Sequence, residues 1–312
     1  MKEKFIIFLA LSFILITLLP SFWFPQTKIS LLEKALPISL FGQLLKEKEE
    51  PIVLIAVGDV MLGRSVNAKM RSLNDFTYPF LKTAPFLSSA DLTFINLEAP
   101  FYDPCPTTNE GMKFCADPQA IKGLVLAGID VANLANNHIR NYGVEGVALT
   151  QSLFQENNID FLSFEENFLI KVIQGTRFGF LGFNLTSGYQ AEKIISRVKE
   201  EKSKVDILIV SFHWGLEYAQ EPSPNQISLA HQVIEAGANL ILGHHSHVIQ
   251  RTEDFQEAKI IYSLGNFVFD QPWSEATKKG LVGVFTFQDK KLIKSGFKEV
   301  YIQNLCQPKF ID

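Results

Sequence analysis

The chain has 312 residues, of which 47% are hydrophobic and 20% are charged, and its formal net charge is −4. These proportions are those of a globular protein. No basic patch is evident in the sequence, which argues against a nucleic-acid partner. An anionic polymer would have to be held by a metal and by local basic groups rather than by bulk charge.

The first 24 residues have the features of a membrane anchor. Residues 5–24 contain no charge, and as a helix they would span roughly 30 Å, the thickness of a bilayer core. Lys2 and Lys4 precede this run and no basic residue follows before Lys28, so the positive-inside rule places residues 1–4 in the cytoplasm. A cleaved signal peptide is the alternative, but the run is longer than a usual h-region and no Ala-x-Ala site follows.

The predicted anchor divides the chain into regions. Residues 25–50 are expected to form a stalk or linker, because the mixed charge run 46–50 is typical of a solvated spacer. Residues 51–312 are expected to form one extracytoplasmic domain that is large enough for a single buried core. The sequence thus predicts a single-pass protein of the cell membrane.

Five short apolar runs each end in polar residues that could bind a metal. The runs predict buried strands, since apolar and β-branched residues follow one another without alternation. Ligands of open α/β folds bind outside the carboxyl ends of strands, so the five ends predict one convergent site. The runs are 52–57, 92–95, 131–134, 205–210 and 240–242, and they lead to Asp59, Glu98, Asn137 with His138, His213, and the segment 243–247.

The segment 243–247 reads Gly-His-His-Ser-His and contains three of the six histidines of the chain. Neutral imidazole is a common ligand of Zn, Mn and Fe. In an extended segment His245 and His247 point to the same side, so both are predicted to face a metal. A lone histidine would more simply cap a loop, whereas this cluster favours a metal site.

Helical patterns fill the gaps between these strands. We expect helices over residues 118–126, 143–155, 190–200 and 226–236, and further strands over 178–183 and 281–287. Alternating strands and helices indicate an α/β protein whose sheets are covered by helices.

The order of the polar motifs resembles that of a known family. Gly-Asp (58–59), Asn-Leu-Glu (96–98), Asn-Asn-His (136–138), His-Trp-Gly (213–215) and Gly-His-His-x-His (243–247) resemble the motifs of the bacterial capsule-synthesis CapA proteins. Residues 262–267, Tyr-Ser-Leu-Gly-Asn-Phe, also match. This family is named for poly-γ-glutamate capsules and is similar in fold to calcineurin-like metallophosphoesterases. The resemblance implies a four-layer α/β/β/α sandwich of metallophosphoesterase type, which periodicity alone does not show.

The resemblance also implies a set of ligands for one or two divalent metal ions. Mixed oxygen and nitrogen ligation suits Mn, Zn and Fe alike, so the ligands do not select one of these metals. His213 and His245 resemble ligands of one ion, and His247 a ligand of the other. The implied ligands are Asp59, Glu98, Asn137, His213, His245 and His247.

One position departs from the phosphoesterase pattern. The first motif of that superfamily is Asp-x-His, but here it reads Asp59-Val60-Met61. A thioether is a poor ligand for a hard divalent ion. The site is therefore expected to hold one metal tightly and a second weakly, or only one.

Other residues are candidates for the chemistry around the metal. His138 resembles the histidine that protonates a leaving group, and His244 is then a residue behind the ligands. Arg64 could bind an anionic substrate group in a bidentate fork, or be a solvated surface arginine. Glu217 and Asp270 could orient histidines, or lie on the surface.

Two cysteines flank a short loop rich in Pro, Thr, Asn and Gly. Cys105 and Cys115 lie ten positions apart, and outside the membrane the environment allows disulfides. We expect the two to form a bridge that contributes about 2–3 kcal/mol through the unfolded state. Cys306 is then unpaired.

Two classes of function follow. The first is a metal-dependent hydrolase or transferase that acts on an anionic cell-envelope polymer, at an amide or a phosphoester bond. The second is a membrane-anchored assembly or export factor that binds such a polymer and uses its metal only structurally. Retention of Asn137 and His138 supports the first class, and Met61 supports the second. The sequence does not say whether membrane-bound synthase subunits are partners.

Overall fold

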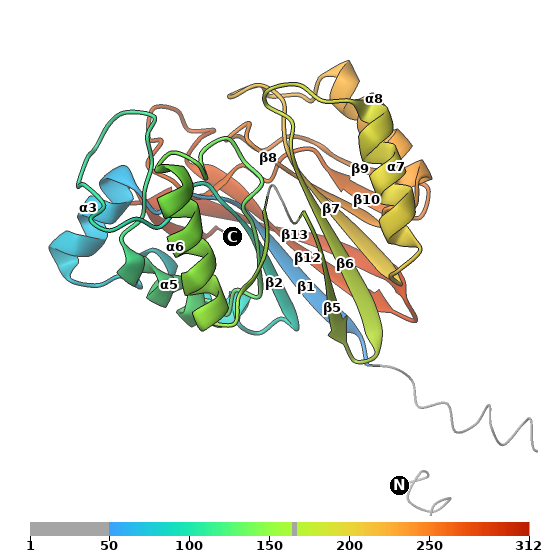
Figure 1. Ribbon diagram of the computed structural model, residues 1–312, viewed down its shortest axis with the longest axis horizontal. Helices are drawn as coiled ribbons and strands as arrows, with labels where there is room; N and C mark the ends of the chain where they lie inside the picture. Colours follow the sequence, from blue (N-terminus) through green and yellow to red (C-terminus); the bar gives the residue numbers. More distant parts are fainter. Residues whose placement is uncertain (1–49, 164–166, 312) are drawn as a thin grey trace, which may run out of the picture. The chain divides into compact units, whose positions relative to one another are not determined.

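Two β-sheets form the centre of the domain (Figure 1). The computed structural model describes residues 50–163 and 167–311. The predicted anchor, residues 5–24, and the stalk up to residue 49 lie outside the described residues. Among the described residues no helix is long and apolar enough to cross a membrane.

The first sheet has eight strands and is mixed. The strands β1 to β4 run parallel to one another, and β11 also pairs with β1 in parallel. β12, β13 and β14 continue the sheet in antiparallel order. The strand order is β14 (Gln307–Phe310), β13 (Lys291–Gln303), β12 (Lys279–Gln288), β1 (Ile52–Val60), β2 (Leu92–Leu97), β3 (Val131–Asn133) and β4 (Asp160–Leu162), with β11 (Asn266–Val268) off this path.

The second sheet has six strands. Its centre is parallel, and its two edge strands, β5 and β9, are antiparallel to their neighbours. The order is β5 (Phe168–Ile173), β6 (Thr176–Asn184), β7 (Ile207–His213), β8 (Leu240–His244), β10 (Ala258–Ile261) and β9 (Thr252–Phe255). The apolar runs seen in the sequence are the central strands of the two sheets, because strands buried on both faces need no polar alternation.

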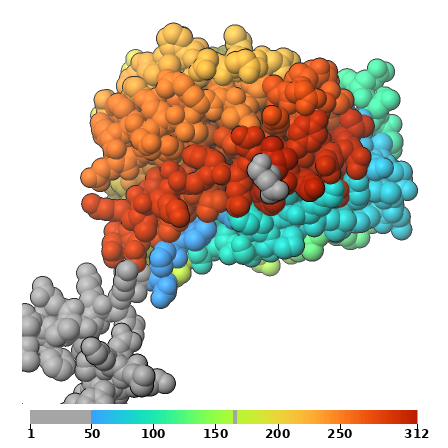
Figure 2. Space-filling view, turned by 180° about the vertical axis from the view of Figure 1, so that it is seen from behind, coloured from blue at the N-terminus to red at the C-terminus, as the bar shows by residue number. Residues whose placement is uncertain are grey.

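Helices cover the outer face of each sheet (Figure 1). The described residues therefore have the predicted order of layers: helix, sheet, sheet, helix. The first sheet is covered by α3 (Arg64–Leu73), α4 (Ala84–Leu87), α5 (Ile121–Leu126) and α6 (Gly143–Glu156), with 3-10 turns at Tyr78–Phe80 and Pro118–Ala120. The second sheet is covered by α7 (Ala191–Lys202) and α8 (Pro224–Glu235). Figure 2 shows the C-terminal strands, in red, at the surface between the two sides.

The two sheets pack face to face through an apolar core. Phe94 of β2 stacks on Phe180 of β6 with ring centroids 5.9 Å apart, and Leu54 and Leu242 lie in the same buried cluster. This packing brings the carboxyl ends of β1, β2, β7 and β8 to one edge of the domain, where the polar motifs lie.

Glycine is required where the chain crosses close to these strands. A Cβ atom on Gly243 would lie 2.0 Å from the carbonyl oxygen of Tyr262, and one on Gly58 would lie 2.2 Å from that of Gly265. Any larger residue would push the segment 262–265 away from β1 and β8. Gly58 and Gly243 thus allow the segment 262–267 to lie against the ends of β1 and β8.

Candidate metal centre

The polar residues at the strand ends come together from both sheets. Asp59 is the second-last residue of β1, and Glu98 follows β2 directly. His213 and His244 are the final residues of β7 and β8. All four side chains are fully buried. The convergent site predicted from the strand ends is therefore present as one buried cluster.

Asp59 is the most heavily bonded carboxylate of this cluster. Its Oδ1 lies 3.0 Å from Nδ1 of His244, and its Oδ2 accepts a hydrogen bond of 3.1 Å from the backbone N–H of His245. Nδ1 of His247 lies 3.2 Å from Oδ2. Burial by itself would raise the pKa of Asp59, but the hydrogen bonds and charges of His244 and His247 hold this pKa well below its usual value. Asp59 is thus an ionised buried ligand candidate, and His244 contacts it through Nδ1.

Glu98 lies near Asp59 and has fewer hydrogen-bond partners than Asp59 has. Burial raises the pKa of Glu98 well above its usual value, and the negative charge of Asp59 raises it further. Its Oε1 accepts a 3.1 Å hydrogen bond from Asn96, while its Oε2 has no hydrogen-bond partner among the described residues. Two buried carboxylates in contact are unfavourable unless a cation compensates their charge.

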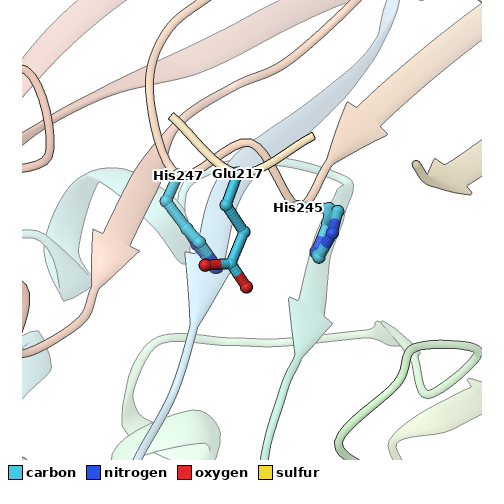
Figure 3. A group of neighbouring side chains, drawn as sticks. All are labelled: Glu217, His245 and His247. Carbon is cyan, nitrogen blue, oxygen red and sulfur yellow. The ribbon is translucent and has the colours of Figure 1, made fainter. Parts of the chain in front are cut away.

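Glu217, His245 and His247 form a second group (Figure 3). Each offers a ligand atom, and these atoms lie within 4.8 Å of one another. Asp59, Glu98 and His247 form a similar group, so His247 is common to both. Glu217 was expected to orient a histidine from behind; the structure instead places its carboxylate among the candidate ligands.

The backbone of the histidine segment is not extended, in contrast to the expectation from the sequence. His245 and His247 have positive φ angles of 92° and 56°, which side-chain-bearing residues adopt only where the surroundings enforce them. The two rings nevertheless converge, with centroids 5.9 Å apart. A tight left-handed loop rather than strand alternation therefore brings them together.

Asn266 fixes the orientation of His247. Its Nδ2 donates to Oε1 of Gln271 and to the carbonyl of Thr277, both at 2.9 Å. Its Oδ1 must therefore face Nδ1 of His247, 3.0 Å away, and this ring nitrogen is the donor. Nε2 of His247, 3.9 Å from Oε2 of Glu98, is left as the ligand nitrogen, an arrangement common behind metal-binding histidines.

His213 contacts both Asn137 and His245. Nε2 of His213 lies 2.9 Å from Oδ1 of Asn137, and the rings of His213 and His245 are 4.6 Å apart. Burial lowers the pKa of His213 well below its usual value, and burial together with the charge of His247 lowers that of His245 to about 4. Both imidazoles are thus neutral at pH 7, the form that binds metals.

The donor set fits a divalent cation. Buried Nδ1 of His245 and Oε2 of Glu98 have no hydrogen-bond partner among the described residues, and neither atom is stable in that state without a ligand. Carboxylate oxygens and imidazole nitrogens together suit Mn, Zn or Fe. The residues that would hold the cation are Asp59, Glu98, Glu217, His245 and His247, with His213 and Asn137 beside them.

Met61 does not belong to this donor set. It is fully buried in the apolar cluster under α3, and its Sδ lies 3.0 Å from the backbone nitrogen of Gly63. The position that is histidine in the Asp-x-His motif is here part of the core. Met61 therefore contributes no ligand atom to the cluster, and this position supplies no nitrogen.

His138 lies near the cluster. Its ring stacks on Phe114 with centroids 4.1 Å apart, and its Nδ1 lies 3.1 Å from Oδ1 of Asn141. Burial lowers the pKa of His138, although the hydrogen bond to Asn141 opposes this shift. The residue is buried, with 5% of its surface exposed, and it lies near enough to His247 and Glu217 for their charges to act on its pKa.

Arg64 and Asp270 have roles that differ from those expected. Nε of Arg64 donates to Oδ1 of Asp270 at 3.1 Å, Nη2 makes a second, shorter contact with the same oxygen, and Nη1 donates to the carbonyl of Gly111 at 2.9 Å. Asp270 also accepts from the backbone of Ser65 at 3.0 Å. Asp270 therefore does not orient a histidine. The guanidinium is 7% exposed and needs this carboxylate to compensate its buried charge.

The structure contains the predicted disulfide between Cys105 and Cys115. The loop that it closes carries Phe114 and Gly111, which contact His138 and Arg64 respectively. Cys306 is free and buried, and burial raises the pKa of its thiol to about 12.

Four asparagines that the sequence alone does not indicate contact the site residues or one another. Asn96 donates to both Asp59 and Glu98, and Asn133 donates to Asn96 at 2.9 Å. Asn266 and Asn141 contact His247 and His138. Asn96 and Asn266 lie inside the motifs Asn-Leu-Glu and Gly-Asn-Phe, so proximity to a ligand in the sequence was the available signal.

Comparison with known proteins agrees with the fold and the motifs. The chain is 33% identical over 267 residues to the capsule biosynthesis protein CapA of Bacillus anthracis, and the match covers 76% of this chain and 65% of the relative. It is 31% identical over 249 residues to the PGA biosynthesis protein CapA of Bacillus subtilis, covering 72% and 65%. The chain thus spans slightly less than two thirds of the length of these curated relatives.

A solved structure and a family profile complete the comparison. The crystal structure titled as a novel phosphatase from Mycoplasma pneumoniae has a TM-score of 0.54 at 14% identity, covering 81% of this chain and 94% of that one. Such a likeness shows a shared fold of mixed α/β sheets and nothing about activity. The profile described as bacterial capsule synthesis protein PGA_cap matches residues 53–271. The chain therefore belongs to the PGA_cap, or CapA-like, family of capsule and poly-glutamate biosynthesis proteins.

Proposed function

We propose that the protein is a metal-dependent hydrolase or transferase that acts on an anionic cell-envelope polymer of the poly-γ-glutamate type. One observation carries this proposal: buried carboxylates and neutral imidazoles from both sheets meet in one cluster, with His138 near enough for His247 and Glu217 to influence its pKa. The printed names of the relatives, a capsule and a PGA biosynthesis protein, support the choice of polymer.

The residues divide into two tasks. Asp59, Glu98, Glu217, His245 and His247 would hold the metal. When bound, a divalent metal polarises the scissile carbonyl or phosphoryl oxygen and makes a water molecule more acidic. His138 would exchange a proton with the group that leaves, and its pKa, lowered by burial, makes its neutral form the resting state.

The same residues suit an amide or a phosphoester bond, because each reaction builds negative charge on oxygen. The family favours the γ-glutamyl amide, since its members are named for that polymer. The phosphatase-like fold favours the phosphoester only by analogy. We therefore rank the amide first.

A second candidate function is polymer assembly or export without catalysis. The observation that favours it is Met61, which is buried in the core where the phosphoesterase motif has a histidine. A protein with this role would bind polymer and use a metal only to hold the two sheets together.

The location and partners belong to the proposal as well. Residues 5–24 would anchor the chain in the cell membrane with residues 1–4 in the cytoplasm and the domain from residue 51 onward outside. Membrane-bound synthase subunits would deliver the polymer to this domain. Fractionation and protease protection of intact cells would test the topology.

The first experiment measures metal content of the full chain purified from membranes. We expect about one or two equivalents, lost in a His245→Ala/His247→Ala double variant. His231→Ala is the matched control, because His231 pairs with Glu253 and stacks on Phe255 away from the cluster. No metal in the native protein, even after incubation with Mn or Zn, would overturn the metal-dependent proposal.

A second experiment separates the two candidate functions. His138→Ala should abolish cleavage or transfer of a γ-glutamyl polymer or a phosphodiester probe while metal content stays unchanged. If the native, metal-loaded protein binds polymer and converts neither substrate, the assembly role is correct instead. If His138→Ala remains active, the proton-transfer role of His138 is wrong.

A further inference from the structure

Asn141 contacts two groups with the same oxygen atom. Its Oδ1 accepts a 2.7 Å hydrogen bond from the backbone N–H of Phe114, and it lies 3.1 Å from Nδ1 of His138. Asn141 belongs to the loop between β3 and α6, three residues beyond His138. No sequence motif described above includes it.

The first contact fixes which way the amide points. A backbone N–H can donate only to an acceptor, so the atom that faces Phe114 is the carbonyl oxygen of Asn141 and not its NH₂ group. The same oxygen has a second lone pair for His138. Because this oxygen cannot donate, Nδ1 of His138 must carry the hydrogen.

The second constraint on His138 comes from the disulfide loop. Phe114 covers one face of the imidazole, with 28° between the ring planes. The guanidinium of Arg64 lies 4.7 Å from the centroid of the Phe114 ring and holds the carbonyl of Gly111 in the same loop. The loop that ends at Cys115 therefore restricts the tilt of His138, while Asn141 restricts its rotation.

We propose that Asn141 is a positioning residue that holds neutral His138 with its hydrogen on Nδ1 and leaves Nε2 as the nitrogen that exchanges a proton with the substrate. The catalytic part of this inference rests on the proposed function. When protonated His138 gives up its Nε2 proton, the leaving atom takes that proton as it departs with the bonding electron pair. The ring that remains has its hydrogen on Nδ1, which is the form that Asn141 stabilises.

An asparagine differs from a carboxylate in this place. Both accept a hydrogen bond from Nδ1, but the amide adds no negative charge beside a cluster that already contains Asp59, Glu98 and Glu217. The amide thus orients the ring without competing for the cation that the cluster would bind. Asn141→Asp keeps both acceptor contacts and changes only the charge, so it is the conservative variant of the test.

The tautomer can be measured without any substrate. In the full chain labelled with ¹⁵N-histidine and incubated with diamagnetic zinc, His138 signals are assigned by their loss in His138→Gln. We expect the hydrogen on Nδ1 in the native protein and in Asn141→Asp, and a mixture of both tautomers in Asn141→Ala. Hydrogen on Nε2 in the native protein, or an unchanged tautomer in Asn141→Ala, would overturn the proposal.

A second variant and a kinetic measurement complete the test of Asn141. Asn141→Leu has the same branching as asparagine and replaces Asn141→Ala if that variant does not fold. With an active substrate, kcat should fall about 10- to 100-fold in Asn141→Ala with little change in KM, and Asn141→Asp should recover most of it. An Nδ1 tautomer together with no activity would refute the proposed function alone, whereas normal kcat in Asn141→Ala would refute the positioning role.

Discussion

The side-chain amide of Asn96 donates a 3.0 Å hydrogen bond to Oδ1 of Asp59. The same Nδ2 lies 3.1 Å from Oε1 of Glu98, and Oδ1 of Asn96 accepts a 2.9 Å hydrogen bond from Asn133. A neutral donor thus stands between two buried carboxylates and is itself held in place by a second amide. The spacing of the two acidic ligand candidates depends on this arrangement.

Asn96→Ala should therefore weaken metal binding more than it weakens the fold. Losing an oriented partner behind metal ligands costs about 10- to 100-fold in affinity, and losing buried hydrogen bonds costs about 1–3 kcal/mol of unfolding free energy. Metal titration and denaturant unfolding measure the two effects. Asn225→Ala, at an exposed position of α8, is the control. If Asn96→Ala binds metal as tightly as the native protein, the two carboxylates do not depend on the amide of Asn96 for their position.

Met61→Leu should leave metal content unchanged. The side chain is fully buried in an apolar cluster, and a Met-to-Leu exchange of similar volume usually costs less than about 1.5 kcal/mol. Elemental analysis and thermal unfolding of the variant check this expectation. A loss of bound metal would show that the thioether of Met61 is a ligand after all.

Removing one partner of the Arg64–Asp270 pair should destabilise the protein without removing its metal. Both side chains are buried, and leaving one buried charge unpaired costs about 3–5 kcal/mol. Arg64→Met, Asp270→Asn and the double variant, compared by denaturant unfolding, give the coupling energy. We expect the double variant to be more stable than the sum of the single losses predicts. An Arg64→Met protein of native stability but with a large rise in KM would restore the anion-binding role.

Asp206 should stabilise the fold at neutral pH and lose this effect in acid. It accepts a 2.9 Å hydrogen bond from the backbone N–H of Arg177 and pairs with Arg177 and Lys290, and these interactions lower its pKa to about 2. Because the pKa is about 3.9 in the unfolded chain, the stabilisation is complete above that pH and disappears as pH falls through 2.

The Asp206→Asn variant isolates this contribution. We expect it to be about 1–2 kcal/mol less stable than the native protein at pH 7, with the difference shrinking steadily below pH 4. Urea unfolding of both proteins between pH 7 and 2 measures it. A difference that is constant with pH would show that the charge of Asp206 is not involved.

The central strands and the helices α5 to α8 were predictable from the sequence, whereas β13 and α3 were not. Residues 52–57 and 240–242 are apolar throughout because both faces of their strands are buried. β13, Lys291–Gln303, is half-exposed and rich in lysine, so its pattern does not differ from that of a surface loop. α3 begins at Arg64 with a φ angle of 47° and without a side-chain cap, and no start signal marks it.

The types of ligand were predictable, but their partners were not. Asp59, Glu98 and the histidines follow apolar runs, which the sequence displays directly. Asn96 acts through its register with Asp59 across the β1–β2 pair, and register is set only when the sheet forms. Asp270 pairs with a residue 206 positions away, a distance over which local patterns carry no information.

The contribution of both sheets to one cluster affects how the chain acquires its site. Asp59 and Glu98 belong to the first sheet, whereas His213, Glu217 and His247 follow strands of the second, and Asn266 returns to β1. No fragment of the chain shorter than residues 59–266 contains all of them. A nascent chain therefore completes the cluster only after β8 and β11 have been synthesised. A cation bound to this cluster would then connect the two sheets and stabilise the folded domain.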